Sequence, residues 1–163
     1  MLRSFTIAIV LAAFSVPAMA DEPVTEPNDV ITAGPKDPKE RTKPGKIDED
    51  APREFKTTES GLKYRILRKS DKIKPKAFNK VQVHYKGWLD DKSIFDSSYQ
   101  RGEKISFPLT AVIPGWTEGM QLVGEGGMIE LEIPGKLGYG KRGTRGIPPD
   151  ATLHFIVELF RVR

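Results

Sequence analysis

Any chemistry in this chain has to come from carboxylates, hydroxyls and aromatic rings, because its 163 residues include no cysteine and only two histidines. Without cysteine there is no thiol nucleophile, no disulfide and no cysteine-based zinc or iron–sulfur site. His84 and His154 both lie in segments that alternate apolar and polar residues, and neither has a second ligand at metal spacing. We therefore predict neither a metal nor a cofactor.

Common catalytic motifs are also missing. Composition alone leaves a Ser-His-Asp triad open, but Ser97 and Ser98 simply follow Asp96, and no Gly-x-Ser-x-Gly elbow surrounds a serine. The glycine-rich stretches 124–127 and 138–140 lack the Gly-Lys-Ser/Thr ending of a phosphate loop. The net charge of +4 is too small and too dispersed to indicate a nucleic-acid partner.

The most informative side chains are aromatic rings placed beside loops. Asp96 directly follows Phe95, and a carboxylate beside an apolar cluster needs a partner, for which Arg101 is available five residues further on. On residue type alone, these rings could equally be ordinary core. The set consists of Tyr85, Phe95, Phe107, Trp116, Tyr139 and Phe155.

Short alternating segments and one helical interval must position these rings. Alternation of apolar and polar residues, or a short apolar run, predicts strands at 64–67, 81–85, 128–133 and 153–159. A short helix is predicted from Pro114, because proline is tolerated in a first turn and Trp116, Met120 and Val123 share one face. The predicted fold class is α+β, an antiparallel sheet with one short helix packed on it.

Residues 1–20 have the three parts of a cleavable secretory signal: Arg3 near the start, an apolar run, and a small-residue end at Ala18-Met19-Ala20. The apolar run, from Phe5 to Val16, is shorter than the roughly 20 residues that span a bilayer. Cleavage after Ala20 is therefore favoured over an uncleaved anchor. We expect an exported protein, periplasmic or secreted, with no stable membrane anchor.

Residues 21–55 contain six of the 13 prolines, a single aromatic residue, Phe55, and ten acidic against six basic residues. Such a stretch buries too little apolar surface to offset its ordering entropy. We predict a disordered linker over 21–55, with a solvated spacer favoured over a partner-binding tail. The remaining residues, 56–163, are predicted to form one folded domain.

Within this domain, a series of short motifs follows one another along the chain. They are Val83-His84-Tyr85-Lys86-Gly87-Trp88-Leu89, Phe95-Asp96-Ser97-Ser98, Arg101-Gly102, the stretch 112–119, Ile133-Pro134, Leu137-Gly138-Tyr139-Gly140 and the stretch 147–153. This series resembles the FK506-binding-protein (FKBP) family of peptidyl-prolyl cis-trans isomerases, in its bacterial exported form. The motifs keep the family's order from about Thr57 to the C-terminus, which is about two thirds of the chain.

The resemblance implies a five- to six-stranded antiparallel half-barrel wrapped around one short helix, with a hydrophobic pocket for the proline ring where sheet and helix meet. Matched by position, Asp96 and Tyr139 are the implied catalytic residues: Asp96 resembles the pocket carboxylate, held by Arg101, and Tyr139 resembles a hydroxyl donor to the substrate carbonyl. The implied substrate-binding residues are Tyr85, Phe95, Arg101, Phe107, Val112, Ile113, Trp116, Ile147 and Phe155. Of these, Trp116 resembles the pocket floor, and the backbone N–H of Ile113 resembles a second donor.

The implied activity is peptidyl-prolyl cis-trans isomerase (EC 5.2.1.8), acting on proline-containing polypeptides without a cofactor and open to the macrolide inhibitor FK506. A proline-binding chaperone or peptide-binding module with little turnover remains the alternative. No long helical dimerisation segment precedes the domain, so a monomer is expected. Two departures affect pocket shape: Ile105 stands where many members have a pocket-wall phenylalanine, and the loop 140–147 is shorter and carries Arg142 and Arg145.

Overall fold

The computed structural model describes residues 31–163. The predicted signal segment, residues 1–20, and the start of the predicted linker lie outside the described residues. Across residues 31–163, none of the helices has the length and apolar character needed to traverse a lipid bilayer.

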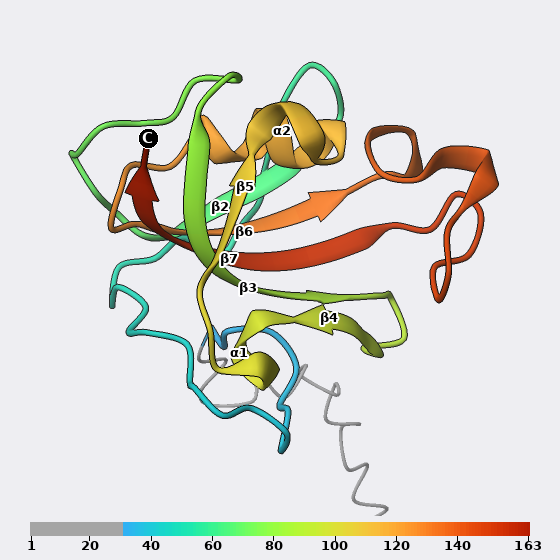
Figure 1. Ribbon diagram of the computed structural model, residues 1–163, viewed down its shortest axis with the longest axis horizontal. Coiled ribbons are helices and arrows are strands. Elements are labelled where there is room, and N and C mark those ends of the chain that lie inside the picture. Colours follow the sequence, from blue (N-terminus) through green and yellow to red (C-terminus); the bar gives the residue numbers. More distant parts are fainter. Residues whose placement is uncertain (1–30) are drawn as a thin grey trace, which may run out of the picture.

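Seven antiparallel strands form one curved sheet in the order β1-β2-β6-β7-β3-β4, with β5 also paired to β3 (Figure 1). β4 pairs with the last part of β3 and β5 with its first part, so the two share one edge of the sheet. The predicted antiparallel architecture is confirmed. The strands are β1 (Lys56–Thr57), β2 (Lys63–Arg68), β3 (Lys80–Trp88), β4 (Ile94–Ser97), β5 (Ile105–Pro108), β6 (Met128–Ile133) and β7 (Leu153–Val162).

The helix predicted from Pro114 is confirmed as α2 (Pro114–Met120). Its two glycines are what allow it to lie close to the sheet: a Cβ at Gly115 would lie 2.5 Å from Ile133, and one at Gly119 would lie 2.7 Å from Leu131. The helix thus rests its glycines on β6. The shorter helices are α1 (Ser98–Arg101), η1 (Leu109–Ala111), η2 (Gly135–Leu137) and η3 (Gly140–Arg142).

The main core lies between α2 and one face of the sheet (Figure 1). Successive strand residues point to opposite faces, and β3 shows the result: Val83 and Tyr85 belong to the main core, whereas His84 and Lys86 are buried on the other face. β3 therefore connects two different buried environments, an apolar one under α2 and a polar one behind the sheet.

The prediction of a free, disordered linker does not hold for residues 31–50, which we call the N-terminal arm. The arm lies across the sheet face opposite α2 (Figure 1), where its Ile31, Ala33 and Ile47 pack on a second apolar cluster. That cluster consists of Leu67, Trp88, Tyr99, Met128 and Ile156.

The arm escapes prediction from composition because most of its contacts are polar. The backbone N–H of Asp48 donates to Leu67 O (2.8 Å), and the Asp48 carboxylate accepts from Lys69 N (2.8 Å). The backbone N–H of Gly45 donates to Glu158 Oε1 (2.9 Å), a carboxylate that is only 4% exposed. The prediction of disorder considered only how much apolar surface the segment can bury. These hydrogen bonds add to that, because they satisfy polar groups that are already buried on the sheet.

Candidate active site

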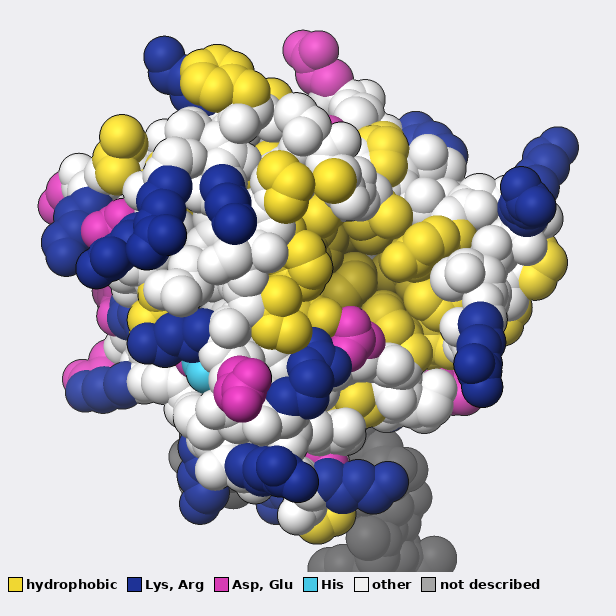
Figure 2. Space-filling view, in the orientation of Figure 1, with side chains coloured by type: hydrophobic (Ala, Val, Ile, Leu, Met, Phe, Trp, Pro, Cys, Tyr) yellow, Lys and Arg dark blue, Asp and Glu magenta, His cyan; other side chains and the backbone are white. Residues whose placement is uncertain are grey.

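A cavity of about 370 Å³ opens between α2, the edge formed by β4 and β5, and the segment that links η1 to α2. Figure 2 shows it as a hollow of hydrophobic side chains, with acidic and basic groups at its edge. Such a concave, mostly apolar cavity with few polar groups is the usual form of a small-ligand site. Its walls are Tyr85, Phe95, Asp96, Phe107, Ala111, Val112, Ile113, Trp116, Tyr139 and Phe155.

Trp116 lies at the centre of the aromatic walls. Its ring stands perpendicular to Tyr85 (centroids 5.3 Å apart, 90°) and to Phe155 (5.4 Å, 87°), and it also meets Phe107 edge-on at 5.8 Å. Edge-to-face contacts of this kind hold aromatic rings in fixed orientations. All three strand rings therefore brace the side chain that forms the cavity floor.

Gly87 on β3 makes room for one of these walls. A Cβ at this position would lie 2.6 Å from the Phe155 ring and 2.7 Å from the Phe95 ring. Those two rings meet edge to face with centroids 5.5 Å apart, directly over the glycine. A side chain at position 87 would separate them and open this side of the cavity.

One polar network borders the aromatic walls. Arg101 donates from Nη1 to Asp96 Oδ1 (2.6 Å) and from Nη2 to the Tyr85 hydroxyl oxygen (3.0 Å), and that hydroxyl donates to the second oxygen of Asp96. Burial, together with the hydrogen bond to Asp96, raises the pKa of Tyr85 well above its ordinary value. The phenol therefore stays protonated at neutral pH, and both Asp96 oxygens are engaged.

This network shows which side chains hold Asp96. The predicted pairing with Arg101 is present, but among the described residues the tyrosine hydroxyl that Asp96 binds is that of Tyr85, and Tyr139 has no hydrogen bond to it. A carboxylate held on both oxygens has its charge stabilised in place. Both oxygens of Asp96 are thus occupied by neighbouring donors.

Nine of the eleven predicted site residues line the cavity. Arg101 does not, and reaches it only through its bonds to Asp96 and Tyr85. Ile147 is 6% exposed and belongs to the main core. Ala111, the last residue of η1, lines the cavity although it was not predicted, and its only signal was its place immediately before the Val112-Ile113 motif.

The two departures from the family pattern lie outside the lining. Ile105 is partly buried against the main core and is not a cavity wall. Tyr139, 41% exposed, stands at the cavity edge, and the exposed Arg142 and Arg145 follow it in the next loop. No cluster of three or more potential metal-ligating residues occurs within residues 31–163.

Residues 71–160 match the family of FKBP-type peptidyl-prolyl cis-trans isomerases, and the chain belongs to this family. The FKBP-type peptidyl-prolyl cis-trans isomerase FkpA of Escherichia coli K12 is 50% identical over 108 residues, which cover 66% of this chain and 40% of that protein. An FKBP-type 22 kDa isomerase of the same organism is 44% identical over 118 residues, covering 71% and 57%. The chain thus spans about two fifths of the FkpA length.

Solved structures agree with this assignment. The crystal structure of E. coli FkpA superposes with a TM-score of 0.67 at 48% identity, covering 69% of this chain and 53% of that one. A peptidyl-prolyl cis-trans isomerase from Pseudomonas syringae superposes with a TM-score of 0.63 at 35% identity, covering 70% and 84%. The predicted family and the predicted FKBP-like fold are both confirmed.

Proposed function

We propose that this chain accelerates rotation about X–Pro peptide bonds by holding the proline ring and its twisted amide in the aromatic cavity. The observation that carries the proposal is the Trp116 floor braced by three perpendicular rings, beside an engaged carboxylate. A cavity of about 370 Å³ walled mainly by aromatic and aliphatic side chains suits a proline ring and its neighbouring amide. The reaction needs no nucleophile, because rotation about the amide cleaves no backbone bond.

Amide resonance is what opposes rotation about an X–Pro bond. A planar X–Pro amide is polar and rotates over a barrier of roughly 18–20 kcal/mol. Halfway through the rotation the resonance is lost and the bond is less polar. A dry aromatic cavity therefore disfavours the planar amide more than the twisted one, which is the differential binding that catalysis requires. Lowering the barrier by about 5 kcal/mol would give an acceleration of several thousand-fold.

Two donors complete the proposed mechanism. The Tyr139 hydroxyl is exposed at the cavity edge, where it can donate to a substrate carbonyl. The backbone N–H of Ile113 is the proposed second donor, at the extended residue that precedes α2. Asp96 and Arg101 act on the wall, because together they fix the Tyr85 hydroxyl.

We further propose that the chain acts on exported, proline-containing polypeptides in the periplasm or outside the cell, as a monomer without a stable membrane anchor, and that FK506 competes for the same cavity. The signal-like composition of residues 1–20 supports export. A proline-binding chaperone with little turnover would use the same cavity. The presence of the complete aromatic set together with Asp96 and Tyr139 favours catalysis.

A peptide isomerisation assay separates the two functions. We expect the chain to accelerate cis-to-trans conversion of a short X–Pro peptide, and FK506 to inhibit it in proportion to cavity occupancy. Binding of the peptide without acceleration would favour the chaperone. If the peptide neither binds nor isomerises faster, the cavity is not a site for X–Pro peptides. Lys46→Ala, on the exposed surface of the arm, is a matched control that should leave the rate unchanged.

A further inference from the structure

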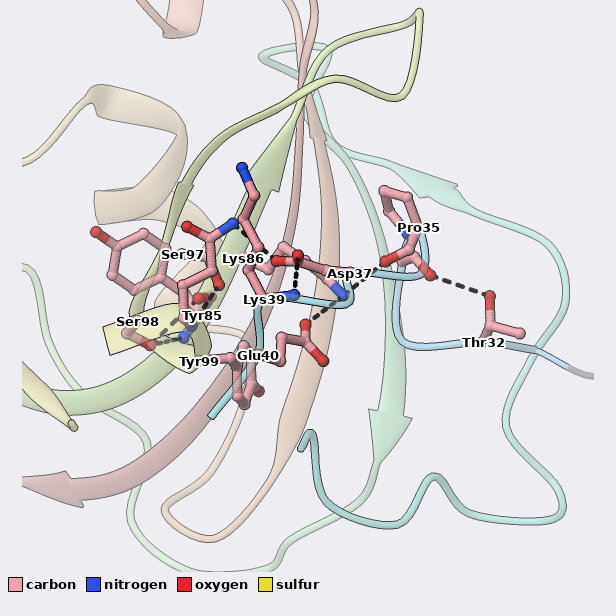
Figure 3. Close-up of polar contacts among 12 residues, drawn as sticks. Thr32, Pro35, Asp37, Lys39, Glu40, Tyr85, Lys86, Ser97, Ser98 and Tyr99 are labelled. Atoms are coloured by element: carbon pink, nitrogen blue, oxygen red, sulfur yellow. Dashed lines mark hydrogen bonds and ion pairs between the residues drawn. The ribbon is translucent and has the colours of Figure 1, made fainter. Parts of the chain in front are cut away.

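Two neighbouring residues of β3 connect the cavity with the N-terminal arm. Tyr85 is a cavity wall, and Lys86 points to the opposite face. Lys86 is 2% exposed, and its Nζ donates to Glu40 Oε1 (2.8 Å) and to Pro35 O (2.8 Å), both supplied by the arm (Figure 3). A buried ammonium needs such partners. The arm therefore binds the strand at the position adjacent to the cavity wall.

The arm also holds α1, the single helical turn that follows β4. The backbone N–H groups of Arg41 and Thr42 donate to Tyr99 O (3.0 and 3.3 Å), and Gln100 Nε2 donates to Asp37 Oδ2 (2.8 Å). A helix of four residues forms too few internal hydrogen bonds to be stable by itself. Its position must therefore be set by the contacts it makes with β3 and with the arm.

α1 in turn is joined to the cavity wall. Ser98, its first residue, accepts a hydrogen bond at Oγ from Tyr85 N (2.8 Å). Arg101, its last residue, binds Asp96 and the Tyr85 hydroxyl. The segment that the arm holds in place thus carries the groups that fix both the backbone and the hydroxyl of Tyr85.

We propose that the N-terminal arm is a positioning element of the cavity, acting through Glu40 on Lys86 and through Asp37 on Gln100. It keeps β4 and α1 in the register at which Asp96 and Arg101 hold the Tyr85 hydroxyl. Glu40 and Asp37 are positioning residues, since neither lines the cavity. The proposal rests on the proposed isomerase function, and it extends the functional unit into a segment whose composition resembles a linker.

The test compares two ways of loosening the arm. The double variant Asp37→Ala/Glu40→Ala removes the side-chain hydrogen bonds from the arm to Gln100 and Lys86, and leaves the backbone contacts in place. Ile47→Ala loosens the arm where it packs on the second apolar cluster, and leaves the hydrogen bonds of the arm to α1 and to Lys86 in place. Glu49→Ala removes only an exposed pair with Lys46 and controls for the loss of one acidic charge from the arm. All variants are assayed in the full chain at a temperature where circular dichroism shows each to be folded. If Asp37→Ala/Glu40→Ala fails to fold, Asp37→Asn/Glu40→Gln takes its place.

We expect the double variant to lose about threefold to tenfold in kcat/KM, because a displaced wall weakens transition-state contacts. Ile47→Ala and Glu49→Ala should retain wild-type kcat/KM even where Ile47→Ala lowers the melting temperature. Amide NMR resonances of Tyr85 and Arg101 should shift in the double variant alone. Activity that follows melting temperature across all variants, or unchanged Tyr85 and Arg101 resonances, would overturn the proposal and leave the arm a stabilising element only.

Failure of the isomerase assignment gives a different result. A wild-type chain that does not accelerate the peptide would remove the catalytic function while the NMR comparison still decides whether the arm positions Tyr85. A wild-type chain that is active, with a double variant equally active, would remove the positioning role and keep the isomerase.

Discussion

The two faces of the sheet are buried by different physics. Under α2, apolar side chains pack in bulk, and the cavity is a gap between rings that hold one another at right angles. Behind the sheet, only a small apolar cluster is covered, and the arm is attached mainly by hydrogen bonds and ion pairs to groups on the strands. The first face depends on shape and volume, because apolar contact is non-directional but closely packed. The second depends on each polar partner being present.

Glu158 shows how closely the second face is satisfied. Its carboxylate, 4% exposed, accepts from the Tyr99 hydroxyl (2.7 Å), from Arg68 Nη2 (2.9 Å) and from Gly45 N of the arm. Arg68 then donates to Lys46 O of the arm (3.1 Å). Breaking a buried pair by removing one partner is strongly destabilising, whereas the intact pair contributes little net stability. This face therefore sets the position of the arm more than it stabilises the domain.

The largest effect should come from breaking the apolar face at its centre. Trp116→Ala removes the ring that three others contact, and a buried aromatic-to-alanine change costs about 3–5 kcal/mol in the free energy of unfolding. Peptide isomerase activity should be lost with it. Chemical denaturation and the peptide assay check this, and a folded variant with unchanged kcat/KM would show that Trp116 is not the floor of the working site.

A smaller effect is expected from removing the other face. Deleting residues 21–50 uncovers Trp88 and Tyr99 and leaves Lys86 and Glu158 to water, which partly replaces the lost partners. We expect the melting temperature to fall by at least about 4 °C, the shift that 1 kcal/mol produces in a domain of somewhat more than 100 residues. A melting temperature equal to that of the full chain would show that the arm detaches freely and behaves as the predicted linker.

The difference between the two faces also explains why the sheet, the helix and the cavity could be predicted from the sequence and the arm could not. Alternation in β3, β6 and β7 and the proline at the start of α2 predict the sheet and helix, because a half-buried strand and a helix start leave local patterns. The cavity residues were placed by resemblance to a family, since the rings come together from distant segments. The arm had no such signal, because its partners are buried charges that a single sequence shows only as ordinary polar residues of strands.

Within the cavity, a pair of variants tests how much of the rate acceleration comes from the apolar walls. Phe107→Ala removes wall without touching a polar group, whereas Tyr139→Phe keeps the ring and removes the hydroxyl. Losing one hydrogen bond costs about 0.5–1.5 kcal/mol, or roughly threefold to tenfold in kcat/KM. If desolvation of the amide carries most of the rate, Phe107→Ala should lose more than that. The reverse order, with both variants folded, would mean that hydrogen bonding to the carbonyl dominates.

The smallest expected effect is a pH dependence of stability that arises on the arm side of the sheet and not in the cavity. His84 lies on the arm side of β3, stacked on Tyr99 (centroids 4.9 Å apart) and bonded at Nδ1 to Ser98 Oγ (2.9 Å). Burial lowers the pKa of His84 below its ordinary value of 6.5. As pH falls below about 6.5 the unfolded chain takes up a proton that the folded chain resists, so stability decreases toward acid. At higher pH both forms are neutral at His84 and this contribution to the slope vanishes.

We therefore expect the melting temperature to fall between pH 7 and 5, and His84→Gln to flatten that dependence without abolishing folding. Activity at a temperature well below melting should stay level from about pH 6 to 8, because the raised pKa of Tyr85 keeps the phenol protonated throughout that range. A bell-shaped activity profile centred near pH 7 would place a titrating group in the cavity and contradict the proposed non-covalent mechanism. If the melting temperature of His84→Gln depends on pH as strongly as that of the wild type, the acid sensitivity comes from carboxylates. Those of the arm are among the candidates, because protonation would weaken their ion pairs.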